Sequence, residues 1–143
     1  MADQTTQHLR IDAPLSTIWD VLTDFEHYTD WARDLKDVGV LERDAEGRGT
    51  VVRFRAAAMG RSTSYTLRYD WSDAPRRLPW ELVEGDIMRV LDGAYEFDER
   101  GGGTDVTYHL RVELVVPLPA FVKRRAEARI VSTALRELRD HVS

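Results

Sequence analysis

Four tyrosines have a setting in this chain that could support chemistry. Each lies on the apolar side of a stretch in which apolar and polar residues alternate, the pattern of a strand with one buried face. They are Tyr65, Tyr69, Tyr95 and Tyr108. A buried phenol hydroxyl without a hydrogen-bond partner costs roughly 1–3 kcal/mol. We therefore expect these hydroxyls to face a wet or ligand-filled cavity; the alternative is that they reach the rim of the protein or bond to the backbone.

Arg89 is the charged residue that regular alternation would place among them. It shares parity with Leu91 and Tyr95, and a guanidinium that points inward must be paired because an isolated buried charge is very costly. Asp20 or Asp24 could neutralise it, as could a carboxylate or enolate of a ligand. The alternative is that Arg89 lies at the end of its strand in solvent, and a β-bulge would also reverse the parity of a strand.

The other reactive residue types form no catalytic or metal-binding pattern. The chain has no cysteine, which excludes disulfides, thiolate nucleophiles and thiolate metal sites. Its histidines are scattered, without the paired spacing of metal ligands: His8, His27, His109 and His141. The glycine-rich segments 47–50 and 101–104 lack lysine and precede strands, unlike a phosphate-binding loop. We predict no metal and no cofactor, and we assign no catalytic residue.

The elements that must position the tyrosines follow a simple order. A strand at residues 5–11 precedes two short helices within residues 13–31, which cannot form a core alone and must plug something. Trp31, at the end of the second helix, could gate a cavity mouth or simply fill the core. Residues 35–114 then alternate in short strands, and their short connections favour antiparallel pairing of neighbours.

The last element is predicted to be a helix from Ala120 to Val142. At 1.5 Å per residue it would be roughly 34 Å long. Its apolar residues recur at four-residue steps: Val122, Ala126, Ile130, Ala134, Leu138 and Val142. Phe121, Val131 and Leu135 lie beside this row. The basic residues of the helix are expected on its polar side, as the solvated flank of an apolar stripe.

Length and composition fit one domain over residues 1–143. Hydrophobic residues make up 43% of the chain and charged residues 31%, which is typical of a soluble globular protein. An N-terminus without an apolar leader, and the lack of an apolar run near 20 residues, lead us to expect a cytoplasmic protein without a transmembrane segment.

Charge is unevenly distributed along the chain. The net charge is −5, yet residues 120–143 carry six basic and three acidic residues, which leaves the preceding part at −8. An acidic body argues against a nucleic-acid partner. The basic helix is compatible with transient contact with an anionic membrane, or with a protein partner that binds its arginines, Arg129 and Arg136 among them.

Several segments resemble one known superfamily. Residues 11–31 read Ile-Asp-Ala-Pro, then Ile-Trp-Asp-Val-Leu-Thr-Asp-Phe, then Tyr and Trp, and further matches lie at 80–85, 91–95, 103–108 and 117–119. This order resembles the START-like (SRPBCC) superfamily and, within it, the polyketide cyclase/dehydrase and coenzyme Q-binding group. The resemblance implies an α+β helix-grip fold, as in birch-pollen-allergen and START-like proteins. In that fold a curved antiparallel sheet of about seven strands holds a long C-terminal helix over its concave face, with an apolar cavity between them.

The resemblance also implies a class of function. Its members include carriers of lipids and isoprenoids and aromatic polyketide cyclases, and a fold alone does not choose among them. We expect binding or carriage of a hydrophobic small molecule such as a lipid, an isoprenoid quinone or a polyketide. The alternative is an aromatic polyketide cyclase/dehydratase that uses pocket tyrosines and Arg89. The expected cavity lining is Trp31, Phe54, Tyr65, Leu67, Tyr69, Trp80, Arg89, Leu91, Tyr95, Tyr108, Leu110, Phe121, Ile130 and Ala134. A monomer and a homodimer both remain open.

Overall fold

The computed structural model describes residues 4–58 and 61–142 of the chain. Its strands form one antiparallel sheet of seven strands in the order β1-β7-β6-β5-β4-β3-β2. The strands are β1 (Thr5–Ile11), β2 (Leu35–Arg43), β3 (Gly49–Ala58), β4 (Arg61–Tyr69), β5 (Arg77–Gly85), β6 (Met88–Arg100) and β7 (Gly103–Leu114). The helical segments are α1 (Leu15–Thr23), η1 (Phe25–Asp30) and α2 (Ala120–Val142). The predicted helix-grip architecture is confirmed.

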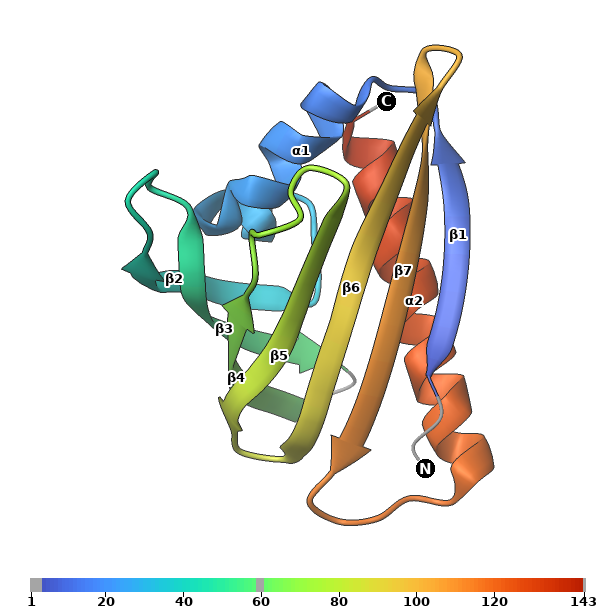
Figure 1. Ribbon diagram of the computed structural model, residues 1–143. Helices are drawn as coiled ribbons and strands as arrows, with labels where there is room; N and C mark the ends of the chain where they lie inside the picture. Colours follow the sequence, from blue (N-terminus) through green and yellow to red (C-terminus); the bar gives the residue numbers. More distant parts are fainter. Residues whose placement is uncertain (1–3, 59–60, 143) are drawn as a thin grey trace.

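The long helix covers one face of the sheet but lies toward one side of it. In Figure 1, α2 runs behind β6 and β7 and alongside β1, while α1 and η1 lie together at the end of the molecule where α2 finishes. The strands that come closest to α2 are β1 and β7. The helix is therefore held mainly by one edge of the sheet, and the strands β2–β5 curve away from it.

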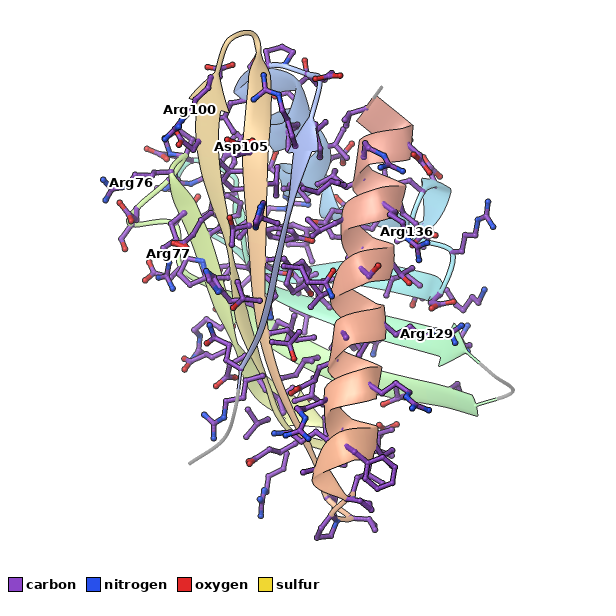
Figure 2. All side chains as sticks on the ribbon, turned by 90° about the vertical axis from the view of Figure 1, so that its right-hand side faces the viewer. Arg76, Arg77, Arg100, Asp105, Arg129 and Arg136 are labelled. Carbon is purple, nitrogen blue, oxygen red and sulfur yellow. The ribbon has the colours of Figure 1, made fainter. Side chains whose placement is uncertain are left out.

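Alternation along the strands places the predicted apolar faces inward. On β4, Leu67 and Tyr69 are buried, and on β7 the residues Val106, Tyr108 and Leu110 are buried. Burial of each large side chain contributes about 1.5–3 kcal/mol, so the concave face of the sheet provides the main apolar core. Figure 2 shows the side chains that fill the space between this face and α2.

The buried row of α2 is shifted from the one expected. The helix buries Glu127, Val131, Leu135 and Leu138. Of these, Leu138 belongs to the predicted row and Val131 and Leu135 were expected beside it, whereas Ile130 of the predicted row is 40% exposed. Both rows recur at helical spacing, so periodicity alone does not distinguish them. The side of the helix that packs on β1 and β7 is buried. The neighbouring row, which includes Ile130, faces the part of the sheet that α2 does not cover.

The first short helix begins at a contact with a strand, and the second begins beside a local contact of its own. Pro14 is extended and precedes α1 instead of forming its first turn, and the Leu15 N–H donates to a Glu99 carboxylate oxygen on β6 at 2.8 Å. Asp24 does not cap η1 with its side chain; its carboxylate lies 2.8 Å from His27 Nδ1. These helices fill one end of the concave face with Phe25 and Tyr28, as a plug.

Candidate functional site

A row of aromatic rings crosses the concave face of the sheet. Its members are Tyr69 on β4, Trp80 on β5, Tyr95 on β6 and Tyr108 on β7. Consecutive ring centroids are 5.8, 5.4 and 4.7 Å apart. The strand register produces this row, because Tyr69 is paired with Trp80 and Tyr95 with Tyr108. Aromatic pairs at such distances contribute more stability than their buried area alone would give. The row therefore forms a rigid floor on the concave face.

Tyr65 extends the floor toward the far side of the sheet. It is paired with Phe54 on β3, and the two rings stack with centroids 5.4 Å apart and planes 18° apart. Tyr65 is partly buried and packs on the core. We call Tyr65, Tyr69, Tyr95 and Tyr108 the phenol cluster.

The hydroxyls of the phenol cluster differ from the hydroxyl of Tyr28. Tyr28 donates a hydrogen bond to the carbonyl oxygen of Leu22, so its polar group is satisfied within the protein. Within residues 4–58 and 61–142, the hydroxyls of the cluster form no hydrogen bond to the protein. They are not counted among the solvent-inaccessible side-chain polar atoms that lack a hydrogen bond, because in these residues that group consists of Arg111 Nε alone. The hydroxyls of the cluster are therefore not completely sealed, and a water molecule or a ligand atom can reach them.

Burial also fixes the protonation state of these phenols. It raises the pKa of Tyr69, Tyr95 and Tyr108 above the ordinary value, because a phenolate loses its hydration there, and the neighbouring phenols act in the same direction. Burial raises the pKa of Tyr65 as well, with a further contribution from the charge of Asp34. At neutral pH the cluster consists of neutral hydroxyls that can donate to an oxygen atom but cannot act as bases.

An apolar cavity lies at the other end of the concave face from the short helices. Its volume is about 230 Å³, somewhat below the range of roughly 300–1,000 Å³ that is common for ligand sites. It lies between the ends of β6 and β7 and the first half of α2. Its lining includes Met88, Leu114, Leu118, Ala126, Glu127 and Ile130. A cavity of this size holds a compact group, so a larger ligand must extend through the mouth or displace side chains.

Glu127 is a fully buried acidic residue in the wall of this cavity. Its Oε2 accepts a hydrogen bond of 2.7 Å from the Val112 backbone N–H, and its Oε1 accepts one of 3.1 Å from the Thr5 hydroxyl. Lys123 Nζ lies 3.9 Å from Oε2. The sequence pattern does not single out Glu127, because a charged residue does not belong to an apolar stripe; its spacing of four from both Lys123 and Val131 was the available signal.

The predicted lining residues divide into two groups. Those on the strands come together on the concave face, where Leu91 and Leu110 are buried beside the aromatic row. Trp31 is half-buried and stacks on His141 at the end of α2, with centroids 6.1 Å apart. Ala134 is half-buried against the core.

Two predicted lining residues are largely exposed, although one of them, Arg89, still lines the edge of the apolar cavity. The side chain of Arg89 is 70% exposed and lies 3.5 Å from the Glu113 carboxylate. A shift in the strand register between Met88 and Val90 breaks the alternation that would have turned it inward. Phe121 is 63% exposed in the first turn of α2, because that turn extends beyond the core.

A second hollow lies on the outer face of the sheet. Its volume is about 530 Å³, and its lining includes Asp73, Arg76, Arg77 and Asp105. Figure 2 shows Arg76 and Arg77 on the side of the sheet away from α2. Charged groups there pair with one another, as Arg76 does with Asp73 at 3.0 Å. This hollow offers an apolar ligand little to contact.

Two further properties bear on the class of protein. None of the helices in the described residues is long and apolar enough to cross a membrane. The same residues contain no cluster of three or more histidine or acidic side chains that could hold a metal ion. The site is thus an aromatic concave surface with neutral hydrogen-bond donors and an apolar cavity.

A helix-grip fold with such an interior defines a class of small-molecule-binding domains. Residues 11–139 match the model of the family described as polyketide cyclase/dehydrase and lipid transport, and the chain belongs to that family. No curated protein matches the sequence.

Solved structures of other proteins share this fold. A START superfamily protein from Mycobacterium smegmatis is 21% identical, with a TM-score of 0.91 and coverage of 97% of this chain and 96% of that one. The Zhui aromatase/cyclase of a Streptomyces species is 18% identical, with a TM-score of 0.84 and coverage of 99% and 94%. A STAR-related lipid transfer protein from Xanthomonas axonopodis is 19% identical, with a TM-score of 0.71 and coverage of 97% and 85%. At these identities the likeness shows the fold alone.

Proposed function

We propose that the protein binds and carries a hydrophobic small molecule that has carbonyl or hydroxyl oxygens, such as an isoprenoid quinone, a lipid or a polyketide. The observation that carries this proposal is the phenol cluster, whose rings are largely buried and whose hydroxyls are protonated and without a protein partner in the described residues. A ligand oxygen would supply the missing hydrogen bonds, and the apolar cavity beside α2 would take part of its body.

Binding fits the interior better than proton-transfer catalysis does. A catalytic base must accept a proton at neutral pH, and the phenols of the cluster are donors. Glu127 is the buried charged residue of the described chain, and both of its oxygens already accept hydrogen bonds. Arg89, which could have stabilised an enolate, is 70% exposed at the edge of the cavity and already pairs with Glu113 at 3.5 Å.

An aromatic polyketide cyclase/dehydratase is the second candidate, favoured by the full-length similarity in fold to an aromatase/cyclase. In that role the phenol cluster would hold a poly-β-ketone in a folded shape and donate hydrogen bonds to the enolate that forms during ring closure. Removing a phenol would then lower the yield of cyclised product more than it lowers substrate binding.

The carrier function requires contact with the membrane or enzyme that supplies the ligand, and we include transient membrane contact in the proposal. A monomer suffices for the role, because the cavity and the phenol cluster are both formed by one chain.

The test compares two ligands of the same shape. Menadione, a naphthoquinone, should quench the fluorescence of Trp80 and bind more tightly than methylnaphthalene, which lacks the carbonyl oxygens. Tyr95→Phe and Tyr108→Phe should each weaken menadione binding roughly two- to tenfold, the value of one hydrogen bond, and leave methylnaphthalene binding unchanged.

Tyr28→Phe is the matched control, since its hydroxyl already has a protein partner, and it should leave the affinity for menadione unchanged. Native mass spectrometry of the purified protein should also show a bound apolar molecule. Equal affinities for the two ligands in every variant would refute a role for the phenol cluster.

A further inference from the structure

Exposed hydrophobic side chains gather at one end of the molecule. We define the apolar tip as Ile87, Val115, Val116, Leu118, Phe121 and Val122. Val115, Val116 and Phe121 are 61%, 71% and 63% exposed, which is unusual for side chains of this size. The other large hydrophobic side chains that are exposed in the described residues, Leu41, Val83 and Ile130, are not part of this group.

The apolar tip is formed by two connections of the chain and the first turn of α2. The Val115 N–H donates a hydrogen bond of 2.9 Å to the Ile87 carbonyl oxygen, so the turn between β5 and β6 is fixed to the loop between β7 and α2. Both connections lie at the end of the molecule where β7 finishes and α2 begins, the lower end in Figure 1. Exposed hydrophobic side chains that gather at one end of a molecule indicate an interaction site.

The apolar tip also borders the mouth of the cavity. Pro117 and Leu118 belong to the loop of the tip and line the cavity, together with Lys123 and Ala126 of the first turns of α2. Anything that binds the tip therefore lies against the opening through which a ligand would pass.

Positive charge flanks the apolar tip. Residues 115–130 contain Lys123, Arg124, Arg125 and Arg129 and a single acidic residue, Glu127. Glu127 is fully buried and pairs with Lys123 at 3.9 Å, so the surface charge of this end comes from Arg124, Arg125 and Arg129. The part of the chain before residue 120 has a net charge of −8, so an anionic surface would attract this end and repel the rest.

We propose that the apolar tip docks on the surface of an anionic lipid bilayer, with its hydrophobic side chains among the acyl chains and the basic residues of α2 at the lipid headgroups. This inference rests on the proposed carrier function and names the surface from which the ligand is taken. Apolar side chains beside a basic helical face are the usual elements of reversible interfacial binding. A second copy fits less well, because two tips in contact would bring Lys123, Arg124 and Arg125 of both chains together.

Vesicle co-sedimentation tests the docking directly. The wild-type protein should bind vesicles of phosphatidylcholine mixed with phosphatidylglycerol at least about tenfold more tightly than vesicles of phosphatidylcholine alone, and salt should weaken the difference. The double variants Val116→Ser with Phe121→Ser, and Arg124→Glu with Arg125→Glu, should each lose binding by about tenfold or more.

Two controls alter the same residue types away from the tip. Leu41→Ser removes a hydrophobic side chain that is 56% exposed on β2, and Arg76→Glu with Arg77→Glu reverses charge on the face of the sheet away from α2 (Figure 2). Both should bind anionic vesicles as the wild type does. The proposal would be overturned if the wild type bound both kinds of vesicle equally, or if the tip variants bound vesicles like the controls. It would also be overturned if the wild type and the controls formed a dimer in solution that the tip variants did not form.

A separate measurement distinguishes this inference from the proposed function. In solution without vesicles, both tip variants should bind menadione with wild-type affinity, because none of the four altered residues lines the cavity. If menadione fails to bind any form while vesicle binding follows the expected pattern, the docking stands and the carrier function falls. If the tip variants bind both menadione and anionic vesicles as the wild type does, the carrier function stands and the docking falls.

Discussion

The lack of a side chain at Gly93 determines how the aromatic row is built. Gly93 on β6 is paired with Trp80 on β5, and a Cβ atom there would lie 2.5 Å from both Trp80 Cζ2 and the carbonyl oxygen of His109. The indole ring thus lies across the strand at the one position that leaves room for it. From there it contacts Tyr95 and Tyr108 with centroids 5.4 and 5.5 Å away.

Gly93→Ala should therefore destabilise the protein by about 1–3 kcal/mol, the usual cost of an overpacked core. The near-ultraviolet circular dichroism signal of Trp80 should change as well, since the ring must move. Gly39→Ala on β2 is the control, because nothing lies within 4 Å of its Cβ position; it should be neutral or slightly stabilising. Urea denaturation measures both, and equal stability of the two variants would contradict this role for Gly93.

At the scale of residues, the sequence predicts what regular alternation controls. The inward direction of Tyr69, Tyr95 and Tyr108 follows from period-two patterns that run unbroken through them. The outward direction of Arg89 does not follow, since the register shift between Met88 and Val90 depends on the partner strand. The burial of Glu127 could not be predicted for a related reason: its partners lie 15 and 122 residues away along the chain.

At the scale of elements, the bounds of the first strand and last helix were predictable while the orientation of the helix was not. Residues 5–11 and 120–142 form the strand and helix expected, because local patterns and the prolines before the helix set their limits. Which side of α2 is buried depends on its position over β1 and β7. Glu127 is the feature of α2 that fixes this position, since it binds both strands.

A carboxylate binds a backbone donor of β7 there. In the described residues the pairing of β1 with β7 begins at Thr5 and Leu110, and beyond that point the Val112 N–H donates to Glu127. Glu127→Ala should lower the free energy of unfolding by about 3 kcal/mol, because it leaves a buried donor unsatisfied.

Glu127→Gln should cost about 1 kcal/mol, since the amide oxygen can still accept from Val112. Asp140→Ala, at a side chain of α2 that is 71% exposed, should change stability by less than about 0.5 kcal/mol. Urea denaturation of the three variants checks the order, and equal losses for the alanine and glutamine variants at position 127 would show that the buried acceptor is unimportant.

At the scale of the whole molecule, the off-centre helix connects the fold to the proposed function. One edge of the sheet and the buried row of α2 make a conventional core. The other side keeps a floor of phenols, a small cavity and an exposed row that includes Ile130. The contacts of the conventional core therefore hold the protein together, while the phenols and the cavity remain available to a ligand. A bound ligand would provide the contacts that these groups lack.

This separation predicts that ligand removal lowers thermal stability without unfolding the protein. A ligand that binds only the folded state stabilises it by about 2.7 kcal/mol at a free concentration of 100 times its dissociation constant. For a chain of 143 residues this corresponds to a rise in Tm of roughly 8 °C. Protein stripped of bound apolar material on a hydrophobic resin should keep its far-ultraviolet circular dichroism spectrum and regain this increase when menadione is added. A variant carrying both Tyr95→Phe and Tyr108→Phe should regain a smaller increase in Tm, because its hydrogen bonds to the carbonyl oxygens are gone. If menadione does not change the Tm of the wild type, the interior is complete without a ligand.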